Sequence, residues 1–305
     1  MAANTAHALA KSTLFPAQLV PDFLNKVKGH SSLAAMNGGE PVKFNGNTYF
    51  TFNFDNEVDI VAEAGAKSHG GGTVAPITIT PIKIEYGMRV SDEFDLASEE
   101  EKLDYLRQFA EGWSKKVARG LDIMALHGKN PRTGSTSSII GTNNFDSQLT
   151  TAGRVVSYSG SDPDGEIEEA VGLVLAAENE VSGAILGPTI RAALSTLKTT
   201  NGDKVYPELA WGGKPDRLNG LKVDFNTTVE TGNEDAKAYL GDFAEYFKWG
   251  IAKEMPIEVI RYGNPDNDAT AGDLKGHNQI YLRGEAYIGW AIMDINAFAK
   301  IEETD

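Results

Sequence analysis

The feature that most constrains this chain is an alternation of apolar and polar residues that begins at Phe50. Polar or acidic residues occupy the odd positions from Thr51 to Asp59, and the apolar residues on the other face are Phe50, Phe52, Phe54, Val58 and Ile60. This period of two predicts a long, half-buried strand. A glycine-rich turn region spans residues 64–76, and a return strand then begins with Ile77 and Ile79. Its phase slips at Thr80–Pro81, where we expect a bulge or an edge irregularity.

A hairpin of this kind has little support of its own. Two strands of about a dozen residues reach on the order of 40 Å, and an isolated two-stranded hairpin is marginal in water. The phenylalanine face therefore needs a partner surface. We expect that surface to lie on another molecule.

The segment after the hairpin predicts one long helix. Ser98 is a suitable N-cap, and Glu101 completes a capping box. An apolar stripe follows, and Gly128 and Pro131 end the helix; the stripe consists of Leu103, Leu106, Phe109, Ala110, Trp113, Val117, Leu121 and Met124. About 30 residues at 1.5 Å per residue give a rod of roughly 45 Å, which suits a structural spine.

The remainder alternates helix and strand signals. Asp162–Pro163 opens a helix, a short buried strand spans 183–187, and a further helix runs from Pro188 to Leu197. Strands near 221–225 and 238–240 complete a compact α/β unit. Two long strands are expected over 245–262 and 278–301, joined by a polar loop. Before the hairpin, a short helical stripe that includes Phe23 and Leu24 lacks the apolar surface to fold alone and must lie against something.

Composition excludes several classes of protein. The chain has 305 residues, no cysteine and a formal charge of −15, so thiolate zinc sites, disulfides and a dedicated nucleic-acid binder are not expected. No apolar run can span a bilayer, and no secretory signal is present, which predicts synthesis in the cytoplasm. The five histidines lack metal-ligand spacing, and the calcium-loop imitation at Asn264, Asp266 and Asp268 fails at Ala269 and Lys275. Neither a cofactor nor a catalytic constellation is expected.

The order of these segments carries a resemblance. STLFPAQLVPDFLNKVKGHSSLAAM resembles an N-terminal arm, and GAILGPTIRAALSTLKTTNGDKVYP with LNGLKVDFNTTV resembles an axial domain. The tail IYLRGEAYIGWAIMDINAFAKI is similar to a closing strand. Together with the hairpin and the spine helix, they resemble the major capsid protein of tailed bacteriophages, which has the Hong Kong 97-type fold. A Gly-x-Pro motif that is usual before one axial strand is replaced here by Leu221–Lys222.

This resemblance implies an α+β fold with named parts. The expected boundaries are an N-arm over 1–48, an E-loop hairpin over 49–90, a P domain over 91–150 with its spine helix at 98–127, an A domain over 151–244, and P-domain strands with the return strand over 245–305. It further implies a structural protein, not an enzyme, that assembles in the host cytoplasm into hexamers and pentamers of an icosahedral virion head around double-stranded DNA. Scaffolding, portal and decoration proteins are the partners such a shell can use.

The subunit interface is expected on the hairpin and the arm. The predicted contact residues are Phe50, Phe52, Phe54, Val58, Ile60, Lys67, Ile77, Ile79, Phe23 and Leu24. Some shells of the family cross-link a hairpin lysine to an asparagine of a neighbour, and the matching residues here are Lys67 with Asn264 or Asn267. A solvated lysine at a loop tip is the more ordinary interpretation.

Two alternatives remain open from the sequence. An encapsulin-type nanocompartment uses the same fold to enclose cargo enzymes, although the N-terminal arm is more similar to the phage type. A monomeric enzyme or adhesin would instead give a small species in solution with an intrinsically ordered hairpin.

Overall fold

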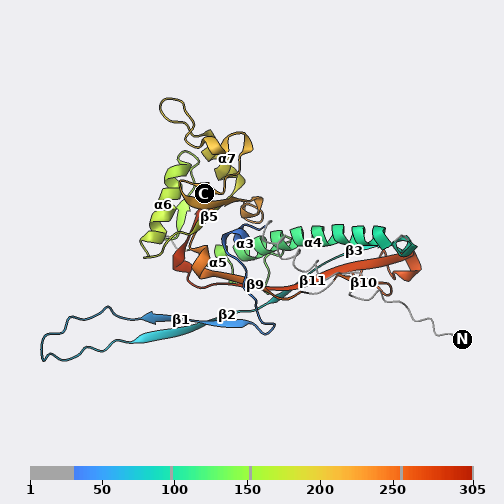
Figure 1. Ribbon diagram of the computed structural model, residues 1–305, viewed down its shortest axis with the longest axis horizontal. Coiled ribbons are helices and arrows are strands. Elements are labelled where there is room, and N and C mark those ends of the chain that lie inside the picture. Colours follow the sequence, from blue (N-terminus) through green and yellow to red (C-terminus); the bar gives the residue numbers. More distant parts are fainter. Residues whose placement is uncertain (1–30, 97–98, 151–152, 255–256, 304–305) are drawn as a thin grey trace.

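The computed structural model describes residues 31–96, 99–150, 153–254 and 257–303, which form three parts. A two-stranded hairpin, made of β1 (Asn47–Phe54) and β2 (Gly72–Ile79), projects to one side of the molecule (Figure 1). An elongated unit of sheet and helix extends to the other side, and a compact α/β unit stands above their meeting point. Within the described ranges, much of the hairpin has no neighbour in its own chain.

The elongated unit is built on one long strand, β11 (Gln279–Ile292). It pairs antiparallel with β3 (Ile82–Ser91), β10 (Glu258–Ile260) and β9 (Phe247–Glu254). The helix α4 (Glu99–His127) runs along this sheet (Figure 1). Close packing depends on Gly284 of β11, because a Cβ there would lie 3.0 Å from the ring of Trp113 on α4.

The predicted spine helix and its apolar stripe are confirmed. Leu106, Phe109, Trp113 and the stripe residues that follow them toward the C-terminal end are buried, whereas Leu103 is 39% exposed. The helix ends at Gly128, whose backbone has φ +64° and whose N–H donates to the Met124 carbonyl over 2.9 Å. Ser98, the expected N-cap, lies outside the described residues.

The compact unit is a six-stranded mixed sheet in the order β4-β12-β8-β5-β7-β6. Two helices pack on it, α6 (Pro163–Leu175) and α7 (Pro188–Thr196). Asp162 caps α6 by accepting from the Gly165 N–H over 3.1 Å, with Pro163 at the first helical position as predicted. The strands are β4 (Val155–Ser157), β12 (Phe298–Glu302), β8 (Ala236–Gly241), β5 (Gly183–Leu186), β7 (Leu221–Phe225) and β6 (Arg217–Leu218).

Several predicted strands are wrong in extent. The return strand of the hairpin does not continue to Val90, because the chain changes sheets at Thr80–Pro81 and β3 pairs with β11. The expected strand over 278–301 is interrupted after Ile292, so that β11 and β12 belong to different sheets. The expected strand over 245–262 is divided into β9 and β10. In the first two cases a long apolar pattern concealed a point where the chain passes from one sheet to another, whereas β9 and β10 both pair with β11 in one sheet.

Short helices and aromatic rings join the parts. Phe145 packs edge-on against Phe298 at a centroid distance of 5.0 Å, and Phe243 packs against Phe298 at 5.1 Å. All three side chains are fully buried. The short helices are α3 (Ser32–Met36), α5 (Phe145–Gln148), α8 (Phe243–Tyr246), η1 (Asp92–Leu96), η2 (Pro207–Gly212), η3 (Thr227–Val229), η4 (Lys275–His277) and η5 (Ile295–Ala297).

Candidate functional site: the assembly surfaces

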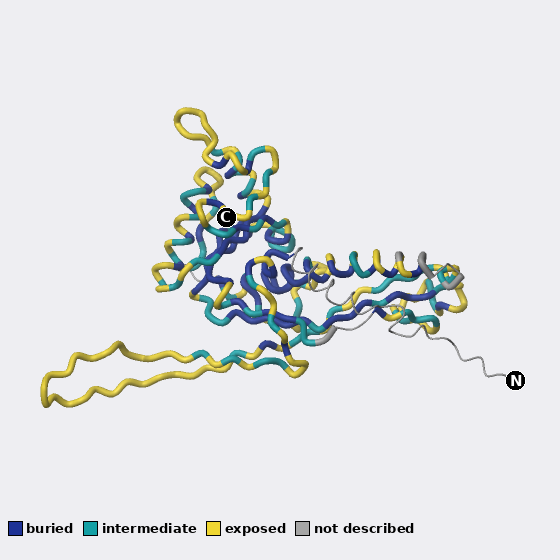
Figure 2. The backbone as a smooth tube through the Cα atoms, viewed as in Figure 1, coloured by how far each residue is buried: buried dark blue, intermediate teal, exposed yellow. Residues whose placement is uncertain are grey.

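One face of the hairpin is an uncovered row of apolar side chains. In the antiparallel register Phe50 lies opposite Pro76 and Phe52 opposite Val74, so these residues share a face with Phe54. The side chains of Phe50, Phe52 and Phe54 are 70%, 61% and 74% exposed. Figure 2 shows the hairpin exposed over most of its length and buried only near its base. The strand geometry therefore presents three rings to whatever lies beyond this chain.

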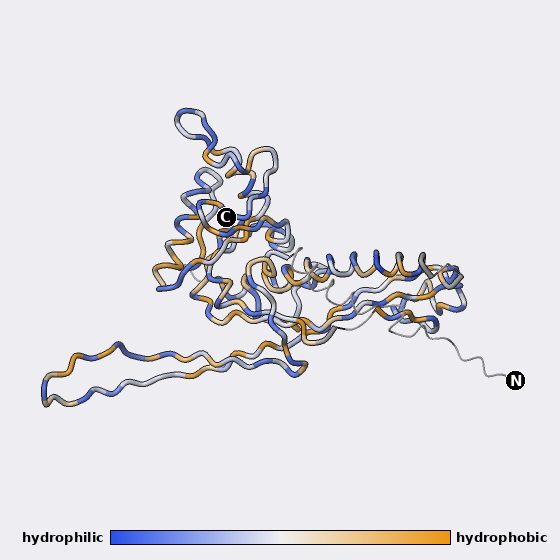
Figure 3. Tube along the Cα trace, in the orientation of Figure 1, coloured by the Kyte–Doolittle hydropathy of each residue, from blue (hydrophilic) through white to orange (hydrophobic). Residues whose placement is uncertain are grey.

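The strands are shorter than the alternation predicts. Both contain eight residues, and residues 55–71 between them have no regular strand structure. Asp55, Asn56, Glu57 and the glycines before β2 are residue types that strands disfavour. In the part of the chain that the structure describes, no third strand pairs with the hairpin. Val58 and Ile60 are consequently 95% and 97% exposed in this connecting loop, which also carries the exposed Lys67. Figure 3 shows apolar and polar residues interspersed along it.

The opposite face anchors the hairpin to its own subunit. Ile79 is 1% exposed and packs with Val42 and Ala291, while Ile77 and Tyr49 lie partly buried against this cluster. The prediction that Ile79 is a contact residue between subunits is therefore wrong, and Ile77 belongs to the same inward face. The alternation alone did not show which face each strand turns toward the body. Phe23 and Leu24, also predicted as contacts, lie outside the described residues.

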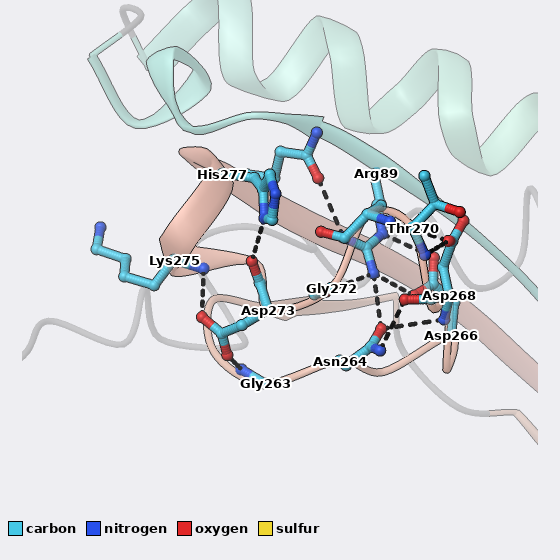
Figure 4. A network of polar contacts seen from close by, with 12 residues as sticks. Arg89, Gly263, Asn264, Asp266, Asp268, Thr270, Gly272, Asp273, Lys275 and His277 are labelled. Atoms are coloured by element: carbon cyan, nitrogen blue, oxygen red, sulfur yellow. Dashed lines mark hydrogen bonds and ion pairs between the residues drawn. The ribbon is translucent and has the colours of Figure 1, made fainter.

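A polar loop at the far end of the elongated unit is organised around one arginine (Figure 4). The Nε of Arg89 donates to Asp266 over 2.8 Å and its Nη2 donates to Asn264 over 2.7 Å. The same guanidinium donates to the carbonyls of Ala271 and Gly272 over 3.2 and 2.9 Å. The hydrogen bond from Arg89 lowers the pKa of Asp266 to about 2. Arg89 thus holds a loop of many polar residues in one conformation.

The structure of this loop determines the hydrogen bonds and the exposure of the two asparagines that are predicted to cross-link. The Asn264 side chain accepts from Arg89 and from the Asp268 N–H, and its Nδ2 donates to the Asp268 carbonyl over 2.9 Å. Asn267 is exposed, with its backbone at φ +52°. The hairpin and the end of the unit that carries β10 point in opposite directions (Figure 1). Any approach of Lys67 to either asparagine would therefore require two copies of the chain.

A buried carboxylate lies where the spine helix meets α3 and the compact unit. Asp122 of α4 is fully buried and accepts from the Ser31 hydroxyl, from the N–H groups of Ser32 and Leu33 at 3.0 and 3.3 Å, and from Thr228 Oγ1 at 2.9 Å. Asn226 donates to the same carboxylate over 3.0 Å. Burial raises the pKa of Asp122 to about 6, although the hydrogen bonds from Ser31, Ser32, Leu33 and Thr228 oppose the shift. The start of α3 and the compact unit are thereby fixed to the spine helix.

A second joint lies at the C-terminal end of the spine helix. His127 is buried, with Nδ1 2.8 Å from Asp146 Oδ2 and Nε2 2.8 Å from the Thr228 carbonyl. Burial by itself raises the pKa of Asp146, but hydrogen bonds from His127 and Tyr239 outweigh it and hold that pKa below its usual value. Both joints connect α4 to the compact unit through polar groups that are buried or partly buried.

The described residues show little that suggests other chemistry. Among them, no group of three or more His, Asp or Glu side chains is placed to hold a metal ion. Within the same ranges no helix is both long and apolar enough to cross a membrane.

Comparison with known proteins decides between the open alternatives. The sequence matches the phage capsid family over residues 12–302. The chain belongs to this family. A solved structure from Mycobacterium phage Ogopogo is 31% identical, covers 90% of this chain and 92% of its own, and superposes with a TM-score of 0.76. A structure from Gordonia phage Cozz is 24% identical, with coverages of 90% and 87% and a TM-score of 0.73.

More distant structures share the fold alone. The capsid of a native GTA particle is 14% identical, covers 90% of each chain and has a TM-score of 0.63. No curated protein matches the sequence. The fold is of the Hong Kong 97 type, as the order of segments predicts, and the chain is a tailed-phage major capsid protein. It is a structural component of a multimeric shell and not an enzyme, and the encapsulin alternative is not favoured.

Sequence reasoning missed two residues of this capsid protein that the structure makes prominent. Asp122 falls within the helical pattern of α4 and has no signal that distinguishes it from a surface acid. Trp211, in η2, is fully exposed with its backbone at φ +58°. A single tryptophan before two glycines matches no motif, so only coordinates could identify it.

Proposed function

We propose that this chain forms the hexamers and pentamers of a closed icosahedral head that encloses double-stranded DNA without reading its sequence. The hairpin is its E-loop, the elongated unit with α4 its P domain and the compact unit its A domain. Assembly takes place in the host cytoplasm, and scaffolding, portal and decoration proteins are its candidate partners in the virion.

The observation that carries this proposal is the bare phenylalanine face of the hairpin. Three ordered rings project from a ribbon whose opposite face is already used at its base. Together they expose roughly 400 Å², which at about 25 cal/mol/Å² represents on the order of 10 kcal/mol if fully covered. Association costs reduce this gain. A surface of this kind is typical of an obligate contact between subunits.

The charge of the chain is compatible with a DNA container. A formal charge of −15 disfavours adhesion to a polyanion, so that packaged DNA could spool without sticking to an acidic inner wall. We infer contact without sequence readout, because such readout needs side chains that reach base edges.

The experiment is to purify the full chain and follow its assembly by sedimentation and electron microscopy. Wild-type protein is expected to form closed shells, and a variant with Phe50, Phe52 and Phe54 replaced by serine is expected to remain as small species. A stable wild-type monomer that forms no shell under any condition would overturn the proposal.

A matched control tests whether the hairpin acts through this face. Asn53 lies on the opposite face of β1 and is exposed. Asn53→Ala is expected to assemble as the wild type does. Loss of assembly in both variants would show that assembly does not depend specifically on the phenylalanine face.

A further inference from the structure

The compact unit contains an open apolar groove that the described residues of the chain leave unfilled. The groove has a volume of about 660 Å³ and runs between α6 and the strands β5, β7 and β6. Its walls include Ile167, Val171 and Leu175 of α6 and Leu221 and Val223 of β7. Leu175 remains 50% exposed at the mouth. Apolar walls of this size favour an apolar side chain as the occupant.

The rim of the groove along α6 is strongly acidic. Residues 162–180 contain seven acidic and no basic residues. Three of these acids, Asp164, Glu168 and Glu180, line the groove on the α6 side, whereas Arg217 and Lys222 line it on the β6–β7 side. An occupant that approaches from this side is expected to carry basic groups next to its apolar anchor.

The same unit presents an apolar anchor elsewhere on its surface. Trp211 has a relative exposure of 104%, so its indole touches nothing that would shield it in its own chain. Its backbone is nevertheless held in place, because Arg191 Nη2 donates to the carbonyls of Gly212 and Gly213, each over 2.7 Å. The guanidinium of Arg191 in turn stacks 4.9 Å from the ring centroid of Phe225. A fixed and fully exposed tryptophan is typical of an interface hot spot.

The segment around Trp211 has the charge that the groove requires. Residues 191–214 carry four basic and two acidic side chains. The basic residues include Lys198 and Lys204 at the two ends of an exposed loop next to η2, and Lys204 Nζ is held by the Ser195 carbonyl over 3.0 Å. A net positive segment with an apolar anchor therefore matches a groove that has apolar walls and an acidic rim along α6.

We propose that Trp211 of one copy inserts into the groove between α6 and β7 of a second copy. Because the full exposure of Trp211 excludes its own groove, only another molecule can provide the site. Trp211 and the groove are different surfaces of the chain, so the contact is heterologous. Such contacts close the copies into a ring when the rotation between neighbouring copies divides a full turn evenly. The inference rests on the proposed function and identifies one of the contacts that would build the pentamers and hexamers.

The absence of cysteine makes a chemical test simple. Ala210→Cys places a thiol next to Trp211 and leaves the indole in place, and Leu175→Cys places one at the mouth of the groove. The two single variants are assembled together and treated with a short bis-maleimide. We expect a cross-linked dimer on a denaturing gel from the mixture and from neither variant alone, and we expect Trp211→Ala in the Ala210→Cys chain to abolish it.

Assembly provides the second measurement. Trp211→Ala is expected to raise the concentration at which half of the subunits assemble by about 30-fold, without lowering the melting temperature of the unassembled subunit. Trp211→Phe is expected to retain most of the assembly. Shells that form normally in Trp211→Ala, or a mixture without the cross-linked dimer, would overturn this contact and leave the capsid function standing. A wild-type chain that forms no shell would overturn both.

Discussion

Phenylalanines at the junction of the parts and in the hairpin have opposite surroundings. The ring centroids of Phe145 and Phe243 lie 5.0 and 5.1 Å from that of Phe298, and all three side chains are fully buried by their own chain. Phe50, Phe52 and Phe54 repeat every second residue on a strand and are left exposed. The same residue type therefore stabilises the subunit in one region and is available to stabilise the shell in the other. The difference arises because a two-stranded ribbon has no second layer to cover it.

The largest effect that separates the two regions is expected from paired truncations. Phe145→Ala should lower the free energy of unfolding of the unassembled subunit by about 4 kcal/mol, because it opens a cavity in the buried cluster. Phe52→Ala should change that free energy by less than about 0.5 kcal/mol and should impair assembly. Chemical denaturation and light scattering measure the two outcomes. Equal destabilisation of the subunit by both variants would mean that the hairpin face packs on its own chain.

The joints between the parts provide the next comparison, because Asp122 stabilises the subunit through hydrogen bonds rather than through packing. Asp122→Asn replaces one acceptor oxygen by a donor that faces the Ser32 N–H or the Thr228 hydroxyl. We expect a loss of about 2 kcal/mol in the free energy of unfolding at pH 7.5. Ser161→Ala, an exposed polar substitution before α6, is the control and should have almost no effect. Equal stability of wild type and Asp122→Asn would show that the carboxylate is not needed at this joint.

The loss caused by Asp122→Asn should also depend on pH. The pKa of Asp122 is raised to about 6 in the folded chain and is near 3.8 when unfolded, so the folded state binds more protons between these values. This group therefore lowers the free energy of unfolding as pH rises from about 4 to 6, by up to about 3 kcal/mol. The asparagine lacks this proton, so its deficit relative to wild type should be larger at pH 4.5 than at pH 7.5. The pKa of Asp146 is lowered and acts in the opposite sense, but it is present in both proteins and cancels in the difference.

The same contrast explains what the sequence could predict. The sequence predicts the spine helix, α6 and the strands β5 and β7 well. Local periodicity, caps and prolines indicate these elements because they depend on residues that are close together in the sequence. The hairpin face was also identified as a surface in need of a partner. The alternation could not show that Ile77 and Ile79 face inward, since that depends on Val42 and Ala291, which are distant in sequence. Asp122 and Trp211 were missed for the same reason, because their significance depends on tertiary surroundings.

The polar loop at the far end of the elongated unit offers a smaller test. It has almost no apolar core and depends on the fork of the Arg89 guanidinium (Figure 4). Arg89→Lys keeps the charge but cannot reach Asp266, Asn264 and two carbonyls at once. We expect faster amide hydrogen exchange in residues 261–278 and unchanged exchange in the compact unit, as measured by mass spectrometry. Unchanged exchange in the loop would show that its turns are stable without the arginine.

The smallest expected effect concerns Lys67. Its two interpretations are a covalent link to an asparagine of a neighbouring subunit and an ordinary solvated side chain. Both polar groups of the Asn264 amide are already engaged within the loop, which leaves Asn267 as the more accessible acceptor. Lys67 itself is exposed in a loop without regular structure. Such a loop does not position the lysine amine next to an asparagine of a neighbouring subunit. We therefore expect shells boiled in denaturant to give a single band of 32.8 kDa, identical for wild type and Lys67→Arg. A ladder of cross-linked bands that Lys67→Arg and Asn267→Asp both remove would establish the covalent link, and would show that contacts in the shell order this loop around its lysine.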